Sequence, residues 1–256
     1  MEARLSAPLT ARMLDLAALS PGMRVLDLAT GRGEPAIAAA HRVGPSGQVL
    51  GIDISASMIA MAGQRAASEG LTNLELRVMD AAALPTVPSC SFDSTLVRWG
   101  LMYMDSPVAA LSEAHRALVP GGKLVAAVWA EPERVSYFSL PRRVLEKYRP
   151  LPPIDQTAPG TFRYASIEDL VGDLDRAGFR LEHLEEMELS VMEAHTPAEL
   201  ITWARAFGMT RLLNELPEGV QREWEEDFAR EAEAFREGLF FRLGGVTRIA
   251  VASRKG

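Results

Sequence analysis

Short apolar segments recur along the first half of the chain, and helical patterns separate most of them. The apolar segments are "MRVLDLA" (23–29), "QVLGIDIS" (48–55), "LELRVMD" (74–80), "FDSTLVRWG" (92–100) and "KLVAAVWA" (123–130). Three of the stretches between them place apolar residues at helical spacing and end near Gly44, Gly70 and Gly121. Strands that are apolar on both faces and alternate with helices are typical of a parallel sheet covered by helices. The pattern therefore predicts an α/β fold.

The pattern changes after residue 130. Residues 131–165 are rich in Pro, Tyr and Phe and indicate an irregular or partly helical insertion. A helix (167–179), a long strand (180–192), two helices within 197–238 and a last strand (246–254) are predicted to follow. We expect one domain over residues 1–256, with a core made of 20–130, 166–194 and 245–254 and two insertions, 131–165 and 195–244.

Composition narrows the classes of function. The 256 residues are 48% hydrophobic, as in a globular protein, and the formal net charge is −7. Nucleic-acid binding relies on clustered Lys and Arg, so this charge argues against a nucleic-acid partner. Cys90 is the single cysteine. We therefore expect no intramolecular disulfide, no metal site and a reducing cytoplasm. The apolar runs are too short to predict a secretory signal or contact with a membrane.

A glycine turn follows the first predicted strand. Gly31, Gly33 and Ala36 match the pattern G-x-G-x-x-A, and a helix is predicted to begin at Pro35. Glycines allow the backbone to approach a ligand, and the start of a helix offers free N–H groups. The same pattern occurs in NAD and FAD enzymes, and a plain strand-to-helix turn without a ligand is the alternative.

Three aspartates stand at or near the ends of the first three strands. Asp53 ends the second strand, where a carboxylate can accept hydrogen bonds from ribose hydroxyls. Asp80 ends the third strand and could accept a hydrogen bond from an adenine amino group. Asp27 lies inside the first strand, where a buried carboxylate is costly unless the fold or a ligand hydrogen-bonds it. A carboxylate beside this turn disfavours phosphate and favours a cationic ligand.

Together these segments resemble a known family. The matching stretches are "VLDLATGRGEPA", "VLGIDISASMIAMA", "LRVMDAAALP", "FDSTLVRWGLMYM", "EAHRALVPGGKLVAAVWA" and "SIEDLVGDLDRAGF". The chain resembles the class I S-adenosylmethionine-dependent methyltransferases, in particular the small-molecule group that includes the ubiquinone/menaquinone-type C-methyltransferases. The resemblance implies a Rossmann-like, mostly parallel sheet of seven strands whose last strand is antiparallel. The insertions lie where this family usually places a helical lid over its substrate.

The resemblance also implies a binding site for S-adenosyl-L-methionine. Asp27 would hold the methionine end, and Asp53 the ribose. Arg98, at the end of the fourth strand, would lie in the wall of the pocket beside the sulfonium. The alternative is that Arg98 forms a salt bridge beneath the pocket. The other implied contacts are the loop residues Ala29, Thr30, Gly31 and Gly33, the adenine-facing Ile54 and Met58, and Asp80 and Ala81 at the adenine edge.

The substrate is expected at the carboxyl ends of the strands, where open α/β sheets bind their ligands. The residues expected there are Trp99, Met102, Tyr103, Trp129, Tyr137, Phe138 and His195. The alternative for many of them is a core between the insertions and the sheet. His195 is the first candidate for a general base and Tyr103 the second. The alternative for His195 is an exposed residue that caps the helix beginning at "TPAEL".

We expect direct, in-line methyl transfer to a hydroxyl or an activated carbon of a small, largely apolar metabolite, for which a secondary metabolite or a quinone precursor is the candidate. The runners-up are an NAD-dependent oxidoreductase and an enzyme, such as a cyclase, that keeps the cofactor without transferring its methyl group. The acidic helix within 217–238 carries Trp224, Phe228 and Phe235 near one face. We expect that face to pack on the sheet or on a second subunit, and the sequence leaves monomer and homodimer open.

Overall fold

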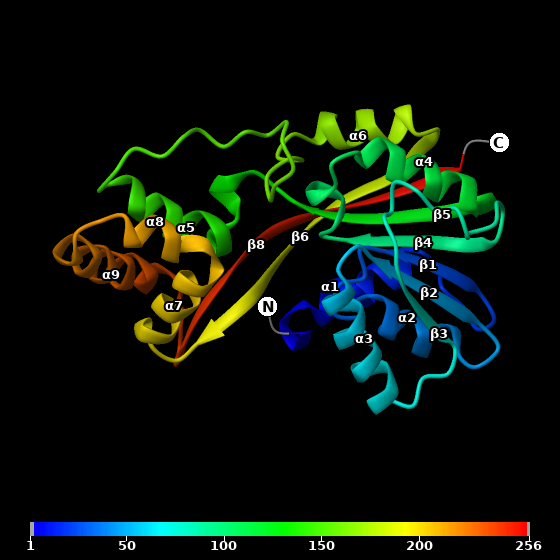
Figure 1. The fold of residues 1–256 in the computed structure, drawn as a ribbon, viewed down its shortest axis with the longest axis horizontal. Helices are drawn as coiled ribbons and strands as arrows, with labels where there is room; N and C mark the ends of the chain where they lie inside the picture. Colours follow the sequence, from blue (N-terminus) through cyan, green and yellow to red (C-terminus); the bar gives the residue numbers. More distant parts are fainter. Residues whose placement is uncertain (1–2, 255–256) are drawn as a thin grey trace. The chain divides into compact units, whose positions relative to one another are not determined.

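A computed structural model describes residues 3–254, apart from the side chains of residues 3, 207 and 208. The strands form one sheet in the order β3-β2-β1-β4-β5-β8-β6, and the short strand β7 pairs with β8 (Figure 1). The chain divides into two compact units. The sheet unit comprises Ala7–Trp129, Asp155–Met187 and the chain from Thr247 onward. The helical unit comprises Ala130–Ile154, Glu188–Val246 and the residues up to Ser6.

The first five strands are parallel, as the apolar segments predict. They are β1 (Arg24–Leu28), β2 (Gln48–Asp53), β3 (Leu74–Val78), β4 (Phe92–Arg98) and β5 (Leu118–Trp129). Leu26 in β1 lies beside Leu50 of β2 and Thr95 of β4, and all three are buried. β5 begins five residues earlier than expected, because α4 already ends at Ala117 and the pairing with β4 shifts its register there.

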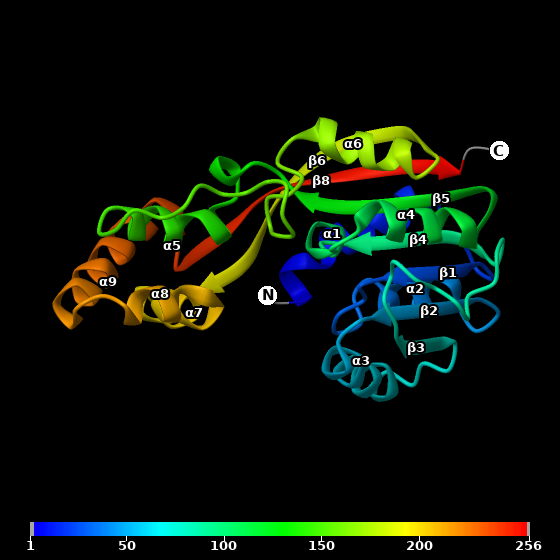
Figure 2. The same cartoon turned by 45° about the horizontal axis from the view of Figure 1, so that its top comes forward.

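The helices of the sheet unit lie on both faces of the sheet. They are α1 (Ala3–Leu16), α2 (Ala36–Val43), α3 (Ala56–Ser68), α4 (Pro107–Ala117) and α6 (Ile167–Arg176). In both ribbon views, α2 and α3 lie on one side of the strands, and α4 and α6 lie together on the other (Figures 1 and 2). The connection from β3 to β4, residues 79–91, runs as turns. Within residues 3–254, one face of the β2–β3 edge therefore has no helix over it.

The last long strand is antiparallel, which confirms the expected sheet. β8 (Phe240–Arg254) pairs with β5 from Lys123 opposite Ser253 to Trp129 opposite Thr247, and β6 (Phe179–Ala194) lies on its other side. β8 begins earlier than predicted. The preceding residues Arg236–Glu237 form β7 rather than the end of a helix, because a turn at Gly238, with φ of 60°, lets them pair back on β8.

The helical unit has its own packed centre. Its helices are α5 (Ser136–Glu146), α7 (Pro197–Ala204), α8 (Thr210–Asn214) and α9 (Glu218–Ala232), with a π-helical turn (Arg205–Met209) between α7 and α8. Trp224 stacks on Phe228 with 5.1 Å between the ring centroids, and the Trp224 indole donates to the carbonyl of Pro141 in α5. The expectation that this face packs on the sheet or a second subunit is therefore wrong, since α5 covers it.

The unit bounds differ in detail from the expected insertions. Residues 155–165 group with the sheet unit, and β6 enters the helical unit at Glu188. That the chain acts as one domain stays a prediction. No helix within residues 3–254 is long and apolar enough to cross a membrane.

Candidate functional site

The turn after β1 is built on a left-handed backbone. Ala29 and Gly31 each have a φ of 54°, and Gly33 has a φ of 97°. Thr30 is buried, and its N–H donates to the carbonyl of Ile52 in β2 at 2.8 Å. These positive φ angles reverse the chain within a few residues, so that the turn leads directly into α2. The predicted loop residues thus lie together at the carboxyl ends of β1 and β2.

Asp53 connects this turn to the end of β2. One carboxylate oxygen accepts the N–H of Gly31 at 2.8 Å, and the other accepts the N–H of Ser55 at 2.9 Å. The sequence predicts Asp53 as an acceptor for ribose hydroxyls. In the structure the same carboxylate also holds the loop, and each oxygen retains a lone pair for a ligand.

Asp27 is a buried carboxylate that the fold satisfies only in part. The side chain is fully inaccessible, and Oδ2 accepts the N–H of Ala36 at 3.1 Å. Oδ1 has no hydrogen-bond partner among residues 3–254. Burial raises the pKa of Asp27 to about 7, although the nearby Thr30 hydroxyl and the charge of Arg98 oppose this rise. A cationic or hydrogen-bonding ligand is the natural partner for such an oxygen.

Arg98 ends β4 and contacts the N-terminal helix. Its guanidinium donates to the Thr10 hydroxyl of α1 at 2.6 Å and lies 5.2 Å from the centre of the Trp99 ring. Burial lowers the pKa of Arg98, and the negative charges of Glu34 and Asp27 act in the opposite direction. Arg98 therefore contributes a positive charge near Asp27 and also attaches α1 to the sheet.

Apolar side chains are exposed beside the carboxylates. Ile54 is 74% exposed and Met58 is 37% exposed. Asp80 is exposed, with its carboxylate accepting the N–H of Ala82 at 2.9 Å, and Ala81 beside it is nearly buried. The sequence argument missed two exposed apolar side chains on the neighbouring elements α3 and β3, namely Met61 and Val78. Met61 lies one helical turn after Met58, and Val78 is the last residue of β3. These two positions could have identified them from the sequence.

Three of the expected substrate residues are packed in the sheet unit. Trp99 stacks on Trp129 with 4.6 Å between the ring centroids and 9° between the planes. The Trp99 indole N–H donates to the Thr247 hydroxyl at 3.0 Å. Both tryptophans and Met102 are buried. The structure thus places these three residues in the core, the alternative that the sequence left open.

Tyr103 is the accessible member of this group. It is half exposed, and its hydroxyl shares a 2.9 Å hydrogen bond with Thr161. Burial raises the pKa of Tyr103 above its usual value, so the phenol stays protonated at neutral pH. A protonated phenol can donate a hydrogen bond, and the role of Tyr103 as a general base stays a prediction. Thr161 was missed because its contact with Tyr103 spans 58 residues of chain.

The remaining expected substrate residues belong to the helical unit. Tyr137 is buried against Trp203, whose indole donates to the Tyr137 hydroxyl at 3.2 Å, and Phe138 meets the Tyr137 ring edge-on. The exposed residue His195 donates its backbone N–H to the carboxylate of Glu199 at 2.9 Å. Its ring lies 4.7 Å from that of Phe240. His195 therefore flanks the start of α7, where Thr196 is the capping residue.

Comparison with known proteins finds matches over about half of this chain. A family model described as "Methyltransferase domain" matches residues 19–140. The chain is 46% identical over 109 residues to the ubiquinone/menaquinone biosynthesis C-methyltransferase UbiE of Bordetella parapertussis, covering 43% of this chain and 42% of that protein. It is 38% identical over 117 residues to the aklanonic acid methyltransferase DauC of Streptomyces sp., covering 46% of this chain and 53% of that protein. The chain spans about half the length of these curated relatives.

Solved structures share the fold over nearly the whole chain. The crystal structure of the 4+2 cyclase SpnF aligns with a TM-score of 0.62 at 21% identity, covering 98% of this chain and 82% of that chain. At this identity the match establishes a common fold and leaves the chemistry open.

Proposed function

We propose that this chain transfers a methyl group from S-adenosyl-L-methionine to a small, largely apolar metabolite, because a family model described as "Methyltransferase domain" matches residues 19–140 and the two curated relatives are methyltransferases by name. The observation that carries the proposal is the buried Asp27 carboxylate, whose Oδ1 lacks a partner among residues 3–254 beside the glycine turn. A phosphate ligand would be repelled there, whereas a cationic ligand would be attracted.

The residues at the ends of β1, β2 and β3 suit each part of this cofactor. Asp27 and the loop Ala29–Gly33 would hold the methionine end, and Asp53 would accept the ribose hydroxyls. Ile54 and Met58 offer exposed apolar surface for the adenine. Asp80 and Ala81 would meet the adenine edge. When bound, the cofactor supplies a methyl group on a positively charged sulfur. The protein then has to position the acceptor in line and exclude water.

The acceptor is proposed to be a hydroxyl or an activated carbon. The names of the two curated relatives refer to ubiquinone and menaquinone biosynthesis and to aklanonic acid, which supports an aromatic or quinone-like substrate here. Tyr103, being protonated, would donate a hydrogen bond to an oxygen of the acceptor. His195 remains the proposed base if the acceptor has to lose a proton. The single Cys90 supports action in a reducing cytoplasm.

The first test is calorimetric titration with S-adenosyl-L-methionine and, separately, with NAD. We expect binding of the first and none of the second, with clear weakening in Asp53→Ala. Binding of NAD alone would overturn the proposal in favour of an oxidoreductase. Failure of well-folded protein to bind S-adenosyl-L-methionine, alone or with candidate acceptors, would also overturn it.

A cofactor-retaining enzyme that transfers no methyl group is the second candidate, because SpnF, a cyclase, shares the fold. The two candidates differ in their products. Incubation with a panel of phenols, quinols and β-dicarbonyl compounds should release S-adenosylhomocysteine in proportion to methylated product. Conversion of a substrate without release of S-adenosylhomocysteine would favour the second candidate.

A further inference from the structure

The outermost strand β3 carries one acidic and one basic side chain at an edge of the sheet. It lies at the end of the strand order, beyond β2 (Figure 2). Sheet edges are commonly protected against pairing by short strands, bulges, proline or charged side chains, lysine above all. β3 reads Leu-Glu-Leu-Arg-Val from Leu74 to Val78, with one acidic and one basic residue flanking Leu76. Its charges are therefore complementary to each other when the strand is reversed.

The pairing with β2 shows which backbone groups face outward. The backbone carbonyl of Asn73 accepts the N–H of Val49, and the N–H of Met79 donates to the backbone carbonyl of Asp53. Asn73 and Met79 therefore point their backbone groups toward β2. Backbone direction alternates along a strand. Glu75 and Arg77 therefore also face β2, and the backbone groups of Leu74, Leu76 and Val78 point to the open edge.

We propose that β3 is a homodimer interface, in which two copies of this chain join their sheets by antiparallel pairing of β3 about Leu76. In this register Leu76 pairs with its own counterpart, and Leu74 pairs with the partner's Val78. All of these residues present outward backbone groups, as hydrogen-bonded pairs require. Symmetric pairing through one self-complementary patch is the usual arrangement of a two-fold dimer.

The side chains favour the same register. Glu75 of each copy lies opposite Arg77 of the other, in a non-hydrogen-bonded pair where side chains approach most closely. A two-fold axis at Glu75 would place Glu75 opposite Glu75, and an axis at Arg77 would place Arg77 opposite Arg77. An axis at Leu76 pairs all five residues of β3 and places opposite charges together.

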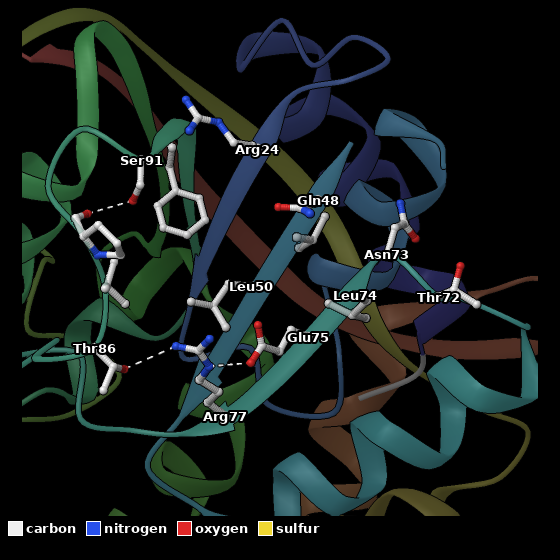
Figure 3. A pocket seen from close by; sticks show the side chains of 14 residues that line it. Arg24, Gln48, Leu50, Thr72, Asn73, Leu74, Glu75, Arg77, Thr86 and Ser91 are labelled. Atoms are coloured by element: carbon white, nitrogen blue, oxygen red, sulfur yellow. Dashed lines mark hydrogen bonds and ion pairs between the residues drawn. The ribbon is translucent and has the colours of Figure 1, made fainter. Parts of the chain in front are cut away.

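The charged side chains already lie on one accessible face. Glu75 and Arg77 form an ion pair at 2.6 Å within the strand, and Arg77 also reaches the Thr86 hydroxyl at 3.2 Å (Figure 3). Both line a groove of about 500 Å³ between the β2–β3 edge and the connection 79–91. In the dimer each charge gains a second neighbour of opposite sign. The attraction between these charges would add to the stabilisation from the main-chain hydrogen bonds between the two copies of β3.

The opposite edge of the sheet provides a contrast. Within the sheet unit, β6 carries Glu182, Glu185 and Glu186, so reversed pairing about Leu184 would bring Glu182 opposite Glu186. β6 also contains a matched ion pair, Arg180 with Glu182 at 3.3 Å, two residues apart like the pair in β3. Reversed pairing about Leu181 would also bring Arg180 opposite Glu182, so β6 provides a matched control edge for the β3 proposal.

The test is sedimentation velocity of the full chain over a range of micromolar concentrations. Wild type should dimerise with rising concentration. Glu75→Arg and Arg77→Glu each place like charges opposite one another, and each should weaken dimerisation by roughly tenfold or more. The double variant Glu75→Arg/Arg77→Glu restores opposite charges and should restore the dimer. Arg180→Glu in β6 is the control and should leave dimerisation unchanged.

Circular dichroism and urea unfolding check that each variant is folded. A wild type that stays monomeric at every concentration would overturn the interface. So would a dimer that both single charge reversals leave intact, or a double variant that is folded but remains monomeric. Because these readouts measure association, they are independent of the methyltransferase proposal.

Discussion

The carboxylate of Asp53 holds the backbone N–H of Gly31 at 2.8 Å, across the gap between β2 and the turn after β1. The same carboxylate accepts the N–H of Ser55 with its other oxygen. A residue predicted from sequence as a ligand contact therefore also shapes the loop that would carry the ligand. Replacing Asp53 should therefore destabilise the loop and weaken ligand binding, and the two effects can be measured separately.

Asp53→Asn is the sharpest test of this double role. An amide offers one acceptor oxygen, so its NH₂ group would face one of the two backbone N–H groups. We expect stability to fall by about 1–3 kcal/mol and S-adenosyl-L-methionine affinity to fall by roughly tenfold or more, since about 1.4 kcal/mol corresponds to tenfold. Urea unfolding and calorimetry measure the two effects. Asp155→Asn, at an exposed turn where the carboxylate accepts the N–H of Thr157, is the control, and an equal loss there would refute the assignment.

The two glycines of the turn should differ when each is replaced by alanine. Gly31 has open space around an added Cβ, so Gly31→Ala meets only the cost of a positive φ, about 1–2 kcal/mol. At Gly33 the added Cβ would lie 2.6 Å from Cδ1 of Ile37, in addition to the positive φ. Urea unfolding should show Gly33→Ala to be the more destabilised variant. The reverse order would show that the turn has a different backbone.

Asp27 should make stability depend on pH. Its pKa is about 7 in the folded protein and about 3.9 in an unfolded chain. As the pH rises from about 4 to about 7, the unfolded chain loses the proton first, so the free energy of unfolding falls. The fall amounts to at most about 4 kcal/mol for this separation. Asp27→Asn should lack this component in urea unfolding measured across the pH range, and parallel pH curves for the two proteins would contradict the buried carboxylate.

Cofactor affinity should depend on pH with the opposite sign. Only the ionised form of Asp27 attracts a cation, so affinity for S-adenosyl-L-methionine should rise by up to about tenfold per pH unit below pH 7 and then level off. Binding near pH 6 should release a proton, which calorimetry detects as a heat that varies with the buffer. Asp27→Asn should bind more weakly and release no proton from this site. If the variant shows the same pH dependence, another group is responsible.

The buried contact between Trp99 and Thr247 can be tested by a double-mutant cycle. Thr247→Val leaves the indole N–H of Trp99 without its acceptor, which should cost about 1–3 kcal/mol. Trp99→Phe removes the N–H and part of the stacking on Trp129. Because the two residues are in contact, the double variant should lose less stability than the sum of the single variants. Strict additivity would show that the hydrogen bond contributes nothing.

Much of the sheet unit was predictable because its signals are local. The apolar strands, the glycines of the turn and the aspartates at the strand ends lie within a few residues of one another in the sequence. In a parallel sheet, the carboxyl ends of neighbouring strands meet at one edge. Asp27, Asp53 and Gly31 could therefore be assigned to one site without coordinates.

The substrate residues were harder to assign because their roles depend on distant partners. Trp99 and Trp129 read equally well as a pocket wall or as core, and stacking together with the bond to Thr247, 148 residues away from Trp99, places them in the core. Trp224 and Phe228 formed an apolar face without a recognisable partner, and only the packing identified α5.

The sequence alone determined the parallel α/β core and the cluster of carboxylates around a glycine turn. These two features follow from hydrophobic periodicity and from the geometry that any parallel sheet imposes, whereas the antiparallel last strand was implied by the resemblance to a known family. The tertiary structure decided that Asp27 keeps one oxygen without a partner among residues 3–254, that Tyr103 is hydrogen-bonded to Thr161, and that β3 lies at an edge of the described sheet. Each of these depends on burial or on contacts between segments far apart in the chain. A local pattern of residue types predicts neither of them.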